Sequence, residues 1–356
     1  LWGGYLQGVK RSAAPLSEDF VHQTMVKHRS TLMKPPPSDE DPVASELFTL
    51  TLRALRRFRF RKPRLYEVST SASFGTQRSL GGARGEIRRL MAQEVGSDEL
   101  LEFTENRPGH ILESRGVTAP RFEDAVRMAG EIPRPYKVMV SAVLEPLKAR
   151  LITKGEALPY WLSRCAQKDM WRYLQRYPQF SPTGRPLDQS DLHGILIRER
   201  RIGSLGFDQW VSGDYSAATD GVDIRLTKLV FELMLESSDY SEEFKDVIRG
   251  VIFEQEIHYP KAQMGPGDLE PIIQKNGQLM GSPLSFPILC IINLVAYWGA
   301  LEEYLDRRVN IQDLPVLING DDILFRADLG FYEVWKDWVR RVGFRLSLGK
   351  NYIHSR

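Results

Sequence analysis

The sequence predicts an α+β fold, in which helices cover one side of an antiparallel sheet. After residue 207, short apolar runs typical of strands alternate with longer stretches whose apolar residues recur at helical spacing. Their order along the chain is strand, helix, helix, hairpin, helix, strand. Asn319-Gly320 lies between two of the strand-like runs and predicts a tight hairpin turn, because both residues accept a positive φ.

The composition excludes a disordered chain, a collagen-like repeat and a disulfide-stapled scaffold. The chain has 356 residues, of which 42% are hydrophobic and 26% are charged, and this is the balance of a packed protein. Its two cysteines, Cys165 and Cys290, are too far apart in sequence to suggest a zinc motif, and they favour a reducing compartment.

Basic charge is concentrated in two segments, although the formal net charge is only +2. Residues 53–64 hold seven Lys and Arg and no acid. Phe58 and Phe60 alternate with these arginines, which predicts either a strand with one basic face or a groove that follows a nucleic-acid backbone. A solvated basic face beside a core is the alternative. Residues 134–176 hold nine basic and three acidic residues, a local charge of 9 − 3 = +6.

Periodicity and chain breakers predict the elements in order. Residues 69–85 are rich in Gly and Ser and predict a loop. Residues 119–175 are expected to be mainly helical, with interruptions at IPRPYK (132–137) and at EPLKARLITKGEA (145–157). The later segments predict a strand at 210–212, helices at 222–236 and 284–297, a hairpin at 316–325, a helix at 331–342 and a strand at 344–348.

One uncharged segment, residues 276–301, is long enough to suggest a membrane span. It contains Ser282, Ser285 and Asn293 together with two prolines. In lipid these residues would leave polar groups and broken backbone bonds unsatisfied. We therefore expect no membrane span and a helix buried in the core of the protein.

Two adjacent acids follow the predicted hairpin turn, in the tripeptide Gly320-Asp321-Asp322. Adjacent carboxylates at a rigid turn repel each other unless a cation is present, and a strand–turn–strand holds both within reach of one divalent ion. The tripeptide alone is a weak signal, because a plain surface hairpin can also carry two turn aspartates.

A second acidic motif runs from Gly213 to Asp220. Asp220 lies where a helix is expected to begin, so an N-cap role is an alternative to a functional one. Asp214 has no such local role. If it faced the Asp321 turn, the carboxylates would offer hard oxygen ligands able to hold two Mg²⁺ ions, as phosphoryl transfer requires.

The motifs together resemble those of viral RNA-dependent RNA polymerases. Motifs A, B, C and D of that family resemble GDYSAATD, GQLMGSPLSFPILCIINL, INGDDILF and GFRLSLGKNY, in the correct order. Upstream, EPLKARLITKG resembles motif F, and the loop at 69–85 loosely resembles motif G. The residues of these motifs are most similar to those of the ourmia-like (botourmiavirus) group, which has narnaviruses and mitoviruses as relatives.

The resemblance implies a right-hand polymerase with an RRM-like antiparallel palm and mainly helical fingers. Because the sequence ends directly after motif D, we expect motif E and the thumb outside this chain, and we expect the fragment alone to be inactive without them. Its first residue is Leu, so we also expect it to be part of a longer protein. The implied divisions are an N-terminal extension with the basic segment at 1–65, fingers at 66–207, palm at 208–237, a fingers insertion at 238–275 and palm at 276–356.

The resemblance also implies catalytic roles. Asp214 and Asp321 would bind the catalytic metals, Mg²⁺ or also Mn²⁺, with Asp322 in a supporting role. Lys350 would be the general acid toward the leaving pyrophosphate, for which an exposed lysine after a strand is the alternative.

Nucleotide binding is implied for the other motif residues. Lys148, Arg150 and Lys154 would neutralise the triphosphate, unless they belong to a solvated basic loop. Asp220 would recognise the ribose 2′-OH and lie within hydrogen-bonding distance of Ser285 or Asn293, directly or through one water. The motif B residues of this site are Gly281, Ser282, Ser285 and Asn293. For Asn293, a buried amide satisfied by backbone groups is the alternative.

The implied function is templated RNA synthesis by a positive-strand RNA virus. Its partners would be an RNA template, the nascent strand and NTPs, and its location the host cytoplasm, or alternatively the mitochondrion. A non-enzymatic RNA-binding protein is a rival hypothesis, and metal dependence separates the two. A reverse transcriptase is the nearer rival, against which Asp220 and Asn293 fit recognition of a ribose.

Overall fold

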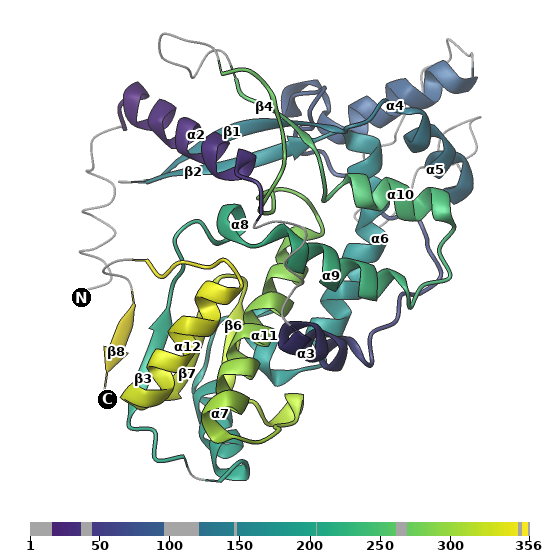
Figure 1. The fold of residues 1–356 in the computed structure, drawn as a ribbon. Helices are drawn as coiled ribbons and strands as arrows, with labels where there is room; N and C mark the ends of the chain where they lie inside the picture. Colours follow the sequence, from purple (N-terminus) through teal and green to yellow (C-terminus); the bar gives the residue numbers. More distant parts are fainter. Residues whose placement is uncertain are drawn as a thin grey trace.

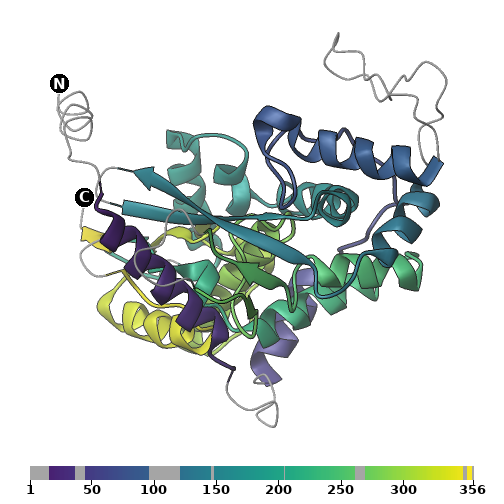
Figure 2. The ribbon, with the colours of Figure 1, turned by 90° about the horizontal axis from the view of Figure 1, so that it is seen from above.

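The structure is a computed structural model that describes residues 16–36, 45–95, 121–145, 148–203, 205–260, 269–347 and 351–354. Within these ranges the chain forms helices and two four-stranded sheets (Figure 1). The mixed α/β class expected from the sequence is confirmed. Figure 2 shows the same fold from above, with the long β1–β2 ribbon crossing over the elements below it.

The C-terminal half forms an antiparallel sheet with the strand order β6-β7-β3-β8. Its strands are β6 (Val316–Asn319), β7 (Asp322–Ala327), β3 (Gln209–Gly213) and β8 (Tyr352–His354). The strand expected at 344–348 is reduced to one bridge, between Tyr215 and Leu346, and the edge strand forms later at β8. The predicted hairpin and the strand at 210–212 are confirmed.

Helices α11 (Ser285–Leu305) and α12 (Leu329–Arg341) pack against each other and against this sheet. Asp328 caps α12 by accepting a hydrogen bond from the Phe331 amide, 2.8 Å away. The buried face of α12 carries Phe331, Trp335 and Trp338, as the helical spacing predicts. Gly343 follows with a φ of +88°, which suits a residue just past a helix end.

Helix α11 is the one helix in the described ranges that is long and apolar enough to cross a membrane. In the fold 89% of its most apolar window is buried inside the protein. Its apolar residues face α12, α9 (Ile224–Leu235) and α3 (Ser45–Leu55). The helix therefore serves as a core helix, as its serines, asparagine and prolines predict.

The second sheet has the order β2-β1-β4-β5. Its strands are β2 (Lys148–Gly155), β1 (Lys137–Glu145), β4 (Glu256–His258) and β5 (Ile272–Ile273). The helical prediction was therefore wrong for residues 138–144, whereas the interruption expected at 145–157 contains β2. Alternating burial explains the strands, because Val138 and Val140 lie in the core while their neighbours are more exposed.

Helices surround this second sheet. They are α2 (Glu18–Met33), α4 (Gly82–Val95), α5 (Phe122–Glu131), α6 (Ala157–Leu174) and α10 (Glu242–Gly250). Further short or peripheral helices are η1 (Arg78–Leu80), η2 (Pro178–Thr183), α7 (Gln189–Arg201), α8 (Ala218–Gly221) and η4 (Ile311–Asp313). The loop expected at 69–85 ends earlier, because α4 begins at Gly82 and buries Ile87 and Met91.

The basic segment at 53–64 is not a strand. Arg53 lies in the last turn of α3 and pairs with Glu302, and the residues after α3 have irregular structure. Phe58 is fully buried and Phe60 packs against Tyr240 with ring centroids 4.9 Å apart. Both aromatic rings therefore belong to the core and line no groove. Most of the other basic side chains of the segment are exposed.

Candidate active site

Asp214 and the Asp321-Asp322 pair lie at one end of neighbouring strands. β3 ends at Gly213, which pairs with Ile323 on β7. Asp214 therefore follows β3 beside the point where β7 begins at Asp322. Antiparallel pairing of these two strands brings together acids that are more than a hundred positions apart in the sequence.

The hairpin turn lies one residue later than its sequence predicts. Asn319 pairs with Asp322, which leaves Gly320 and Asp321 as the two loop residues. Gly320 has a φ of +68°, as the first position of such a loop demands, whereas Asn319 ends β6. A Cβ atom at Gly320 would also lie 2.8 Å from the ring of Phe286. This turn fixes the position of the Asp321 carboxylate.

The pKa values of Asp321 and Asp322 are raised. Burial is the largest cause of the raised pKa of Asp321 and of Asp322, and the nearby charge of Asp214 raises both further. Asp321 adds to the raised pKa of Asp322. The three carboxylates therefore form one electrostatic group, and a cation placed among them would relieve their repulsion.

Two cations of β2 act on this acidic group. Lys148, Arg150 and Lys154 share one face of β2, because alternate residues of a strand point to the same side. Lys148 and Arg150 lower the pKa of both Asp321 and Asp322, although Arg150 Nε also lies 3.1 Å from Glu145 Oε1. Lys154 lies toward the other end of the strand and is not among the main causes of either shift.

Asn293 ties the two acidic motifs together from α11. Its side chain is fully buried. Its Oδ1 accepts a hydrogen bond from the Tyr215 hydroxyl at 2.8 Å, and its Nδ2 donates to the Gly320 carbonyl at 3.0 Å. Tyr215 follows Asp214 and Gly320 precedes Asp321. Asn293 thus fixes the backbone beside both acids, and its amide is satisfied at both ends.

Asp220 is not a helix N-cap. It lies inside the short helix α8, whose N-cap position is Ala217. The following helix α9 is capped by Asp223, which accepts a hydrogen bond from the Arg225 amide at 2.9 Å. The capping role that the sequence allowed for Asp220 therefore belongs to Asp223.

The Asp220 carboxylate lies in a largely buried site. The Thr219 hydroxyl donates to its Oδ1 at 3.3 Å, and His28 Nε2 lies 3.9 Å from the same oxygen. Burial raises the pKa of Asp220 to about 7. The expected direct hydrogen bond to Ser285 or Asn293 is not formed, because both side chains bond to other groups.

The loop of motif B packs on β2. Gly281 has a φ of +149°, and a Cβ there would lie 2.0 Å from the Thr153 carbonyl oxygen, so this contact requires glycine. The Ser282 hydroxyl donates to the Val251 carbonyl at 2.9 Å and the Ser285 hydroxyl to the Leu279 carbonyl at 3.0 Å. Both serine hydroxyls therefore bond to backbone carbonyls, Ser285 within the loop and Ser282 outside it.

Lys350 lies outside the described residues. Its neighbour Asn351 is described, and its Oδ1 accepts a hydrogen bond from the Asp214 amide at 3.1 Å. Sequence reasoning missed Asn351, Tyr215 and His28 as neighbours of the acids. For His28 a signal was present, since it falls at a buried position of an amphipathic helix where an apolar residue is expected.

The acids are not assembled into a closed metal site. In the part of the chain that the structure describes, no group of three or more His, Cys, Asp and Glu side chains is arranged to hold a metal ion. The chemistry of Asp214, Asp321 and Asp322 nevertheless fits a divalent cation, because carboxylate oxygens are hard ligands and their charges repel. Burial raises the pKa values of Asp321 and Asp322, and the charge of Asp214 raises them further.

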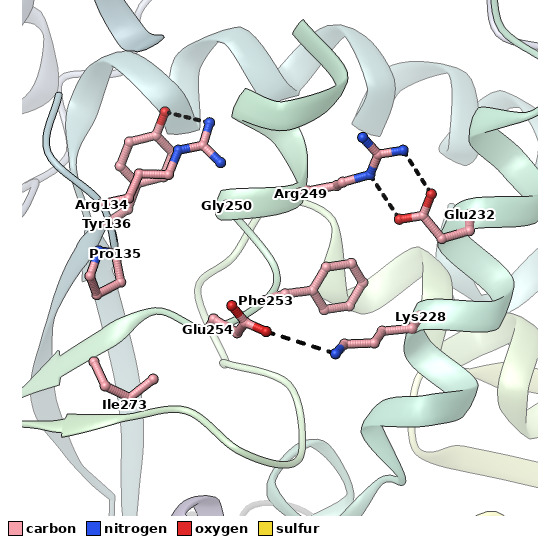
Figure 3. A pocket seen from close by; sticks show the side chains of 10 residues that line it. All are labelled: Arg134, Pro135, Tyr136, Lys228, Glu232, Arg249, Gly250, Phe253, Glu254 and Ile273. Carbon is pink, nitrogen blue, oxygen red and sulfur yellow. Dashed lines mark hydrogen bonds and ion pairs between the residues drawn. The ribbon is translucent and has the colours of Figure 1, made fainter. Parts of the chain in front are cut away.

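A separate pocket of about 650 Å³ lies between α9, α10 and the start of β1 (Figure 3). Its cations are already engaged. Arg249 Nε lies 2.9 Å from Glu232 Oε1, and Lys228 Nζ lies 3.9 Å from Glu254 Oε1. Arg134, the third cation of the lining, hydrogen-bonds to the Tyr136 hydroxyl at 3.4 Å, so each basic side chain of the pocket already has a partner.

Comparisons with known proteins point the same way as the motifs. No family model matches the chain. It is 31% identical to the RNA-dependent RNA polymerase of Ourmia melon virus (isolate Melon/Iran/VE9), over 99% of this chain and 43% of that protein. It is 23% identical to the RNA-directed RNA polymerase of Saccharomyces 23S RNA narnavirus, over 74% of this chain and 28% of that protein. The chain spans less than half the length of these curated relatives.

Proposed function

We propose that this chain, a relative of the ourmia-like and narnavirus RNA-dependent RNA polymerases, carries the nucleotidyl-transfer site of a positive-strand virus replicase. The observation that supports this best is the position of Asp214 beside the Asp321-Asp322 turn, facing Lys148 and Arg150. In right-hand terms, the β6-β7-β3-β8 sheet would be the palm and the β2-β1-β4-β5 sheet part of the fingers.

Asp214 and Asp321 would hold Mg²⁺ or Mn²⁺, with Asp322 beside them. Bound divalent ions supply charge stabilisation to a transferring phosphoryl group. The protein's own contribution is to keep the carboxylates ionised and fixed. Lys148 and Arg150 favour ionisation, because they lower the pKa of Asp321 and Asp322.

The same two cations are suited to bind the nucleotide triphosphate. They lie on one face of an edge strand, and they sit within electrostatic reach of the acids. Phosphoryl transfer needs positive charge near the phosphates as negative charge develops on the leaving group. We assign the same task to Lys154, further along the face.

Rigid placement of the acids is part of the proposal. Asn293 bonds to Tyr215 and to Gly320, so the backbone beside Asp214 and beside Asp321 is held by one buried side chain. Catalytic groups need to be held close to their productive geometry, and buried hydrogen bonds of this kind provide that support. Asp220 would read the ribose 2′-OH beside this centre.

The test is templated synthesis by the full viral polypeptide that carries this chain. With an RNA template, NTPs and Mg²⁺, the protein should extend RNA, and EDTA should stop extension while leaving RNA binding in place. RNA binding without any metal-dependent synthesis would support the rival RNA-binding protein. Preferential use of dNTPs would support a reverse transcriptase instead.

A further inference from the structure

Helix α2 is remote from motif A in sequence and packs directly on it. α2 contacts α8, β2 and β5, and Figures 1 and 2 both place it beside the β1–β2 ribbon. Its buried positions recur at helical spacing and are Val21, Met25, His28 and Leu32. Three of them are apolar and join the core of the β1 sheet. His28 is the polar member of this buried face, and it points at Asp220.

His28 lies between a tyrosine, to which it is hydrogen-bonded, and Asp220, which its other ring nitrogen faces. The imidazole is 5% exposed, its Nδ1 lies 3.0 Å from the Tyr259 hydroxyl, and its Nε2 lies 3.9 Å from Asp220 Oδ1. Burial lowers the pKa of His28 to about 4, so at neutral pH the ring carries one N–H. Burial also raises the pKa of Tyr259, which keeps its hydroxyl protonated. When that hydroxyl donates to Nδ1, the ring proton resides on Nε2 and faces the carboxylate.

Backbone hydrogen bonds tie α2 to the segment that enters motif B, and tie that segment to motif A. The Leu32 carbonyl accepts hydrogen bonds from the amides of Lys275 and Asn276 at 2.9 and 3.2 Å. The Gln278 amide donates to the Thr219 carbonyl at 2.6 Å. A displacement of α2 would therefore shift the surroundings of Asp220 on two sides.

We propose that His28 is a positioning residue, which holds the Asp220 carboxylate for recognition of the ribose 2′-OH, while Tyr259 fixes the tautomer of its ring. The inference rests on the proposed function and adds to it a residue from the N-terminal segment. Discrimination by a hydrogen-bonding site depends on keeping the polar group in place, since a loosely held carboxylate loses its advantage for the substrate that carries the hydroxyl.

The experiment compares kcat/KM for an NTP and for the matching dNTP in the full viral polypeptide. The His28→Phe variant keeps a ring but has no N–H, and we expect the NTP preference to fall about 10-fold. The His28→Gln variant can place an amide N–H near the position of Nε2, and we expect it to restore most of the preference. Tyr259→Phe removes one hydroxyl and should lower the preference about 3-fold. Gln23→Ala, on the exposed face of α2, is the matched control and should change nothing.

Each outcome decides between a positioning and a structural role. If folded His28→Phe protein retains the wild-type NTP preference, His28 only fills space and the inference is overturned. If that variant does not fold, Tyr259→Phe decides, and an unchanged preference there overturns the inference equally. A wild-type polypeptide that makes no RNA would refute the proposed function itself, a result distinct from an active enzyme with unaltered selectivity.

Discussion

The two carboxylates of motif A have opposite surroundings. Asp214 lies beside Asp321 and Asp322, in a group of like charges that two cations of β2 partly offset. Asp220, six residues later, lies under α2 beside a neutral imidazole, with its pKa raised to about 7 by burial. The comparison teaches that different surroundings suit the two acids of one short motif to different tasks. Asp214 is suited to binding cations, and Asp220 is suited to accepting a hydrogen bond from a neutral hydroxyl.

The largest expected effect comes from removing one charge of the cation-binding group. Asp321→Asn in the full viral polypeptide should lower RNA synthesis by on the order of 10³-fold or more, because charge stabilisation in phosphoryl transfer is worth that much. RNA binding should stay nearly intact. Asp306→Asn, an exposed acid at the far end of α11, is the control. Retained synthesis by the Asp321 variant would remove this acid from the centre.

A variant of Asn293 tests whether this motif B side chain supports the Asp214–Asp321 group or Asp220. Asn293→Leu leaves the Tyr215 hydroxyl and the Gly320 carbonyl without their buried partner, so the free energy of unfolding should fall by about 2–4 kcal/mol. Denaturant unfolding measures the loss, and synthesis should fall with both substrates alike. A selective loss of NTP over dNTP preference would instead place Asn293 with Asp220, against the geometry.

A variant of Arg150 tests whether the cations of β2 act at the Asp214–Asp321 group. Arg150→Ala should raise the apparent KM for NTPs and lower kcat, together about 10- to 100-fold in kcat/KM, because the cation serves both the bound and the reacting triphosphate. Steady-state kinetics check this. Lys154→Ala, on the same face but not among the main causes of the acids' pKa shifts, should show a smaller change. Equal effects of the two variants would contradict the assigned placement.

The smallest expected effect is a pH dependence of sugar selectivity. Asp220 is protonated below its pKa of about 7 and ionised above it. The ionised form accepts the stronger hydrogen bond from a 2′-OH, so NTP preference should rise a few-fold between pH about 6 and about 8. Near Asp220, His28 stays neutral because its pKa is about 4, Tyr259 stays protonated because burial raises its pKa, and Lys27 acts on Asp220 by lowering the pKa of that carboxyl. Asp220→Asn should give a flat profile, and a wild-type profile that falls with pH would reverse the assignment.

Much of the fold could be predicted because it depends on local periodicity. The hairpin around Gly320 and the amphipathic helix with Trp335 and Trp338 follow from spacing of apolar residues. Strands β1 and β2 were missed because Pro-rich and basic stretches interrupt the apolar pattern that would mark them. The turn shifted by one residue because strand pairing, rather than the Asn-Gly pair, decides which residues form the loop.

From the sequence, the site could be predicted only as a set of acidic and basic residues, without their partners. Motif order pointed to Asp214, Asp321 and Lys148, and the pairing of β3 with β7 places the two acids together. The partners of Asn293 and of Asp220 could not be derived, because tertiary packing selects them. Asn293 hydrogen-bonds to Tyr215 and Gly320, and not to Asp220 as the resemblance implied. Asp220 lies beside a histidine from a helix far upstream.

The central claim is that Asp214 and Asp321 jointly hold divalent cations, and metal binding measures it most directly. Crystals of the polypeptide soaked with Mn²⁺, at a concentration that supports synthesis, should show anomalous density in contact with both carboxylates. Crystals of Asp321→Asn should lose it. Anomalous density only at other acidic side chains, with Asp214 and Asp321 unliganded while the enzyme is active, would contradict the account.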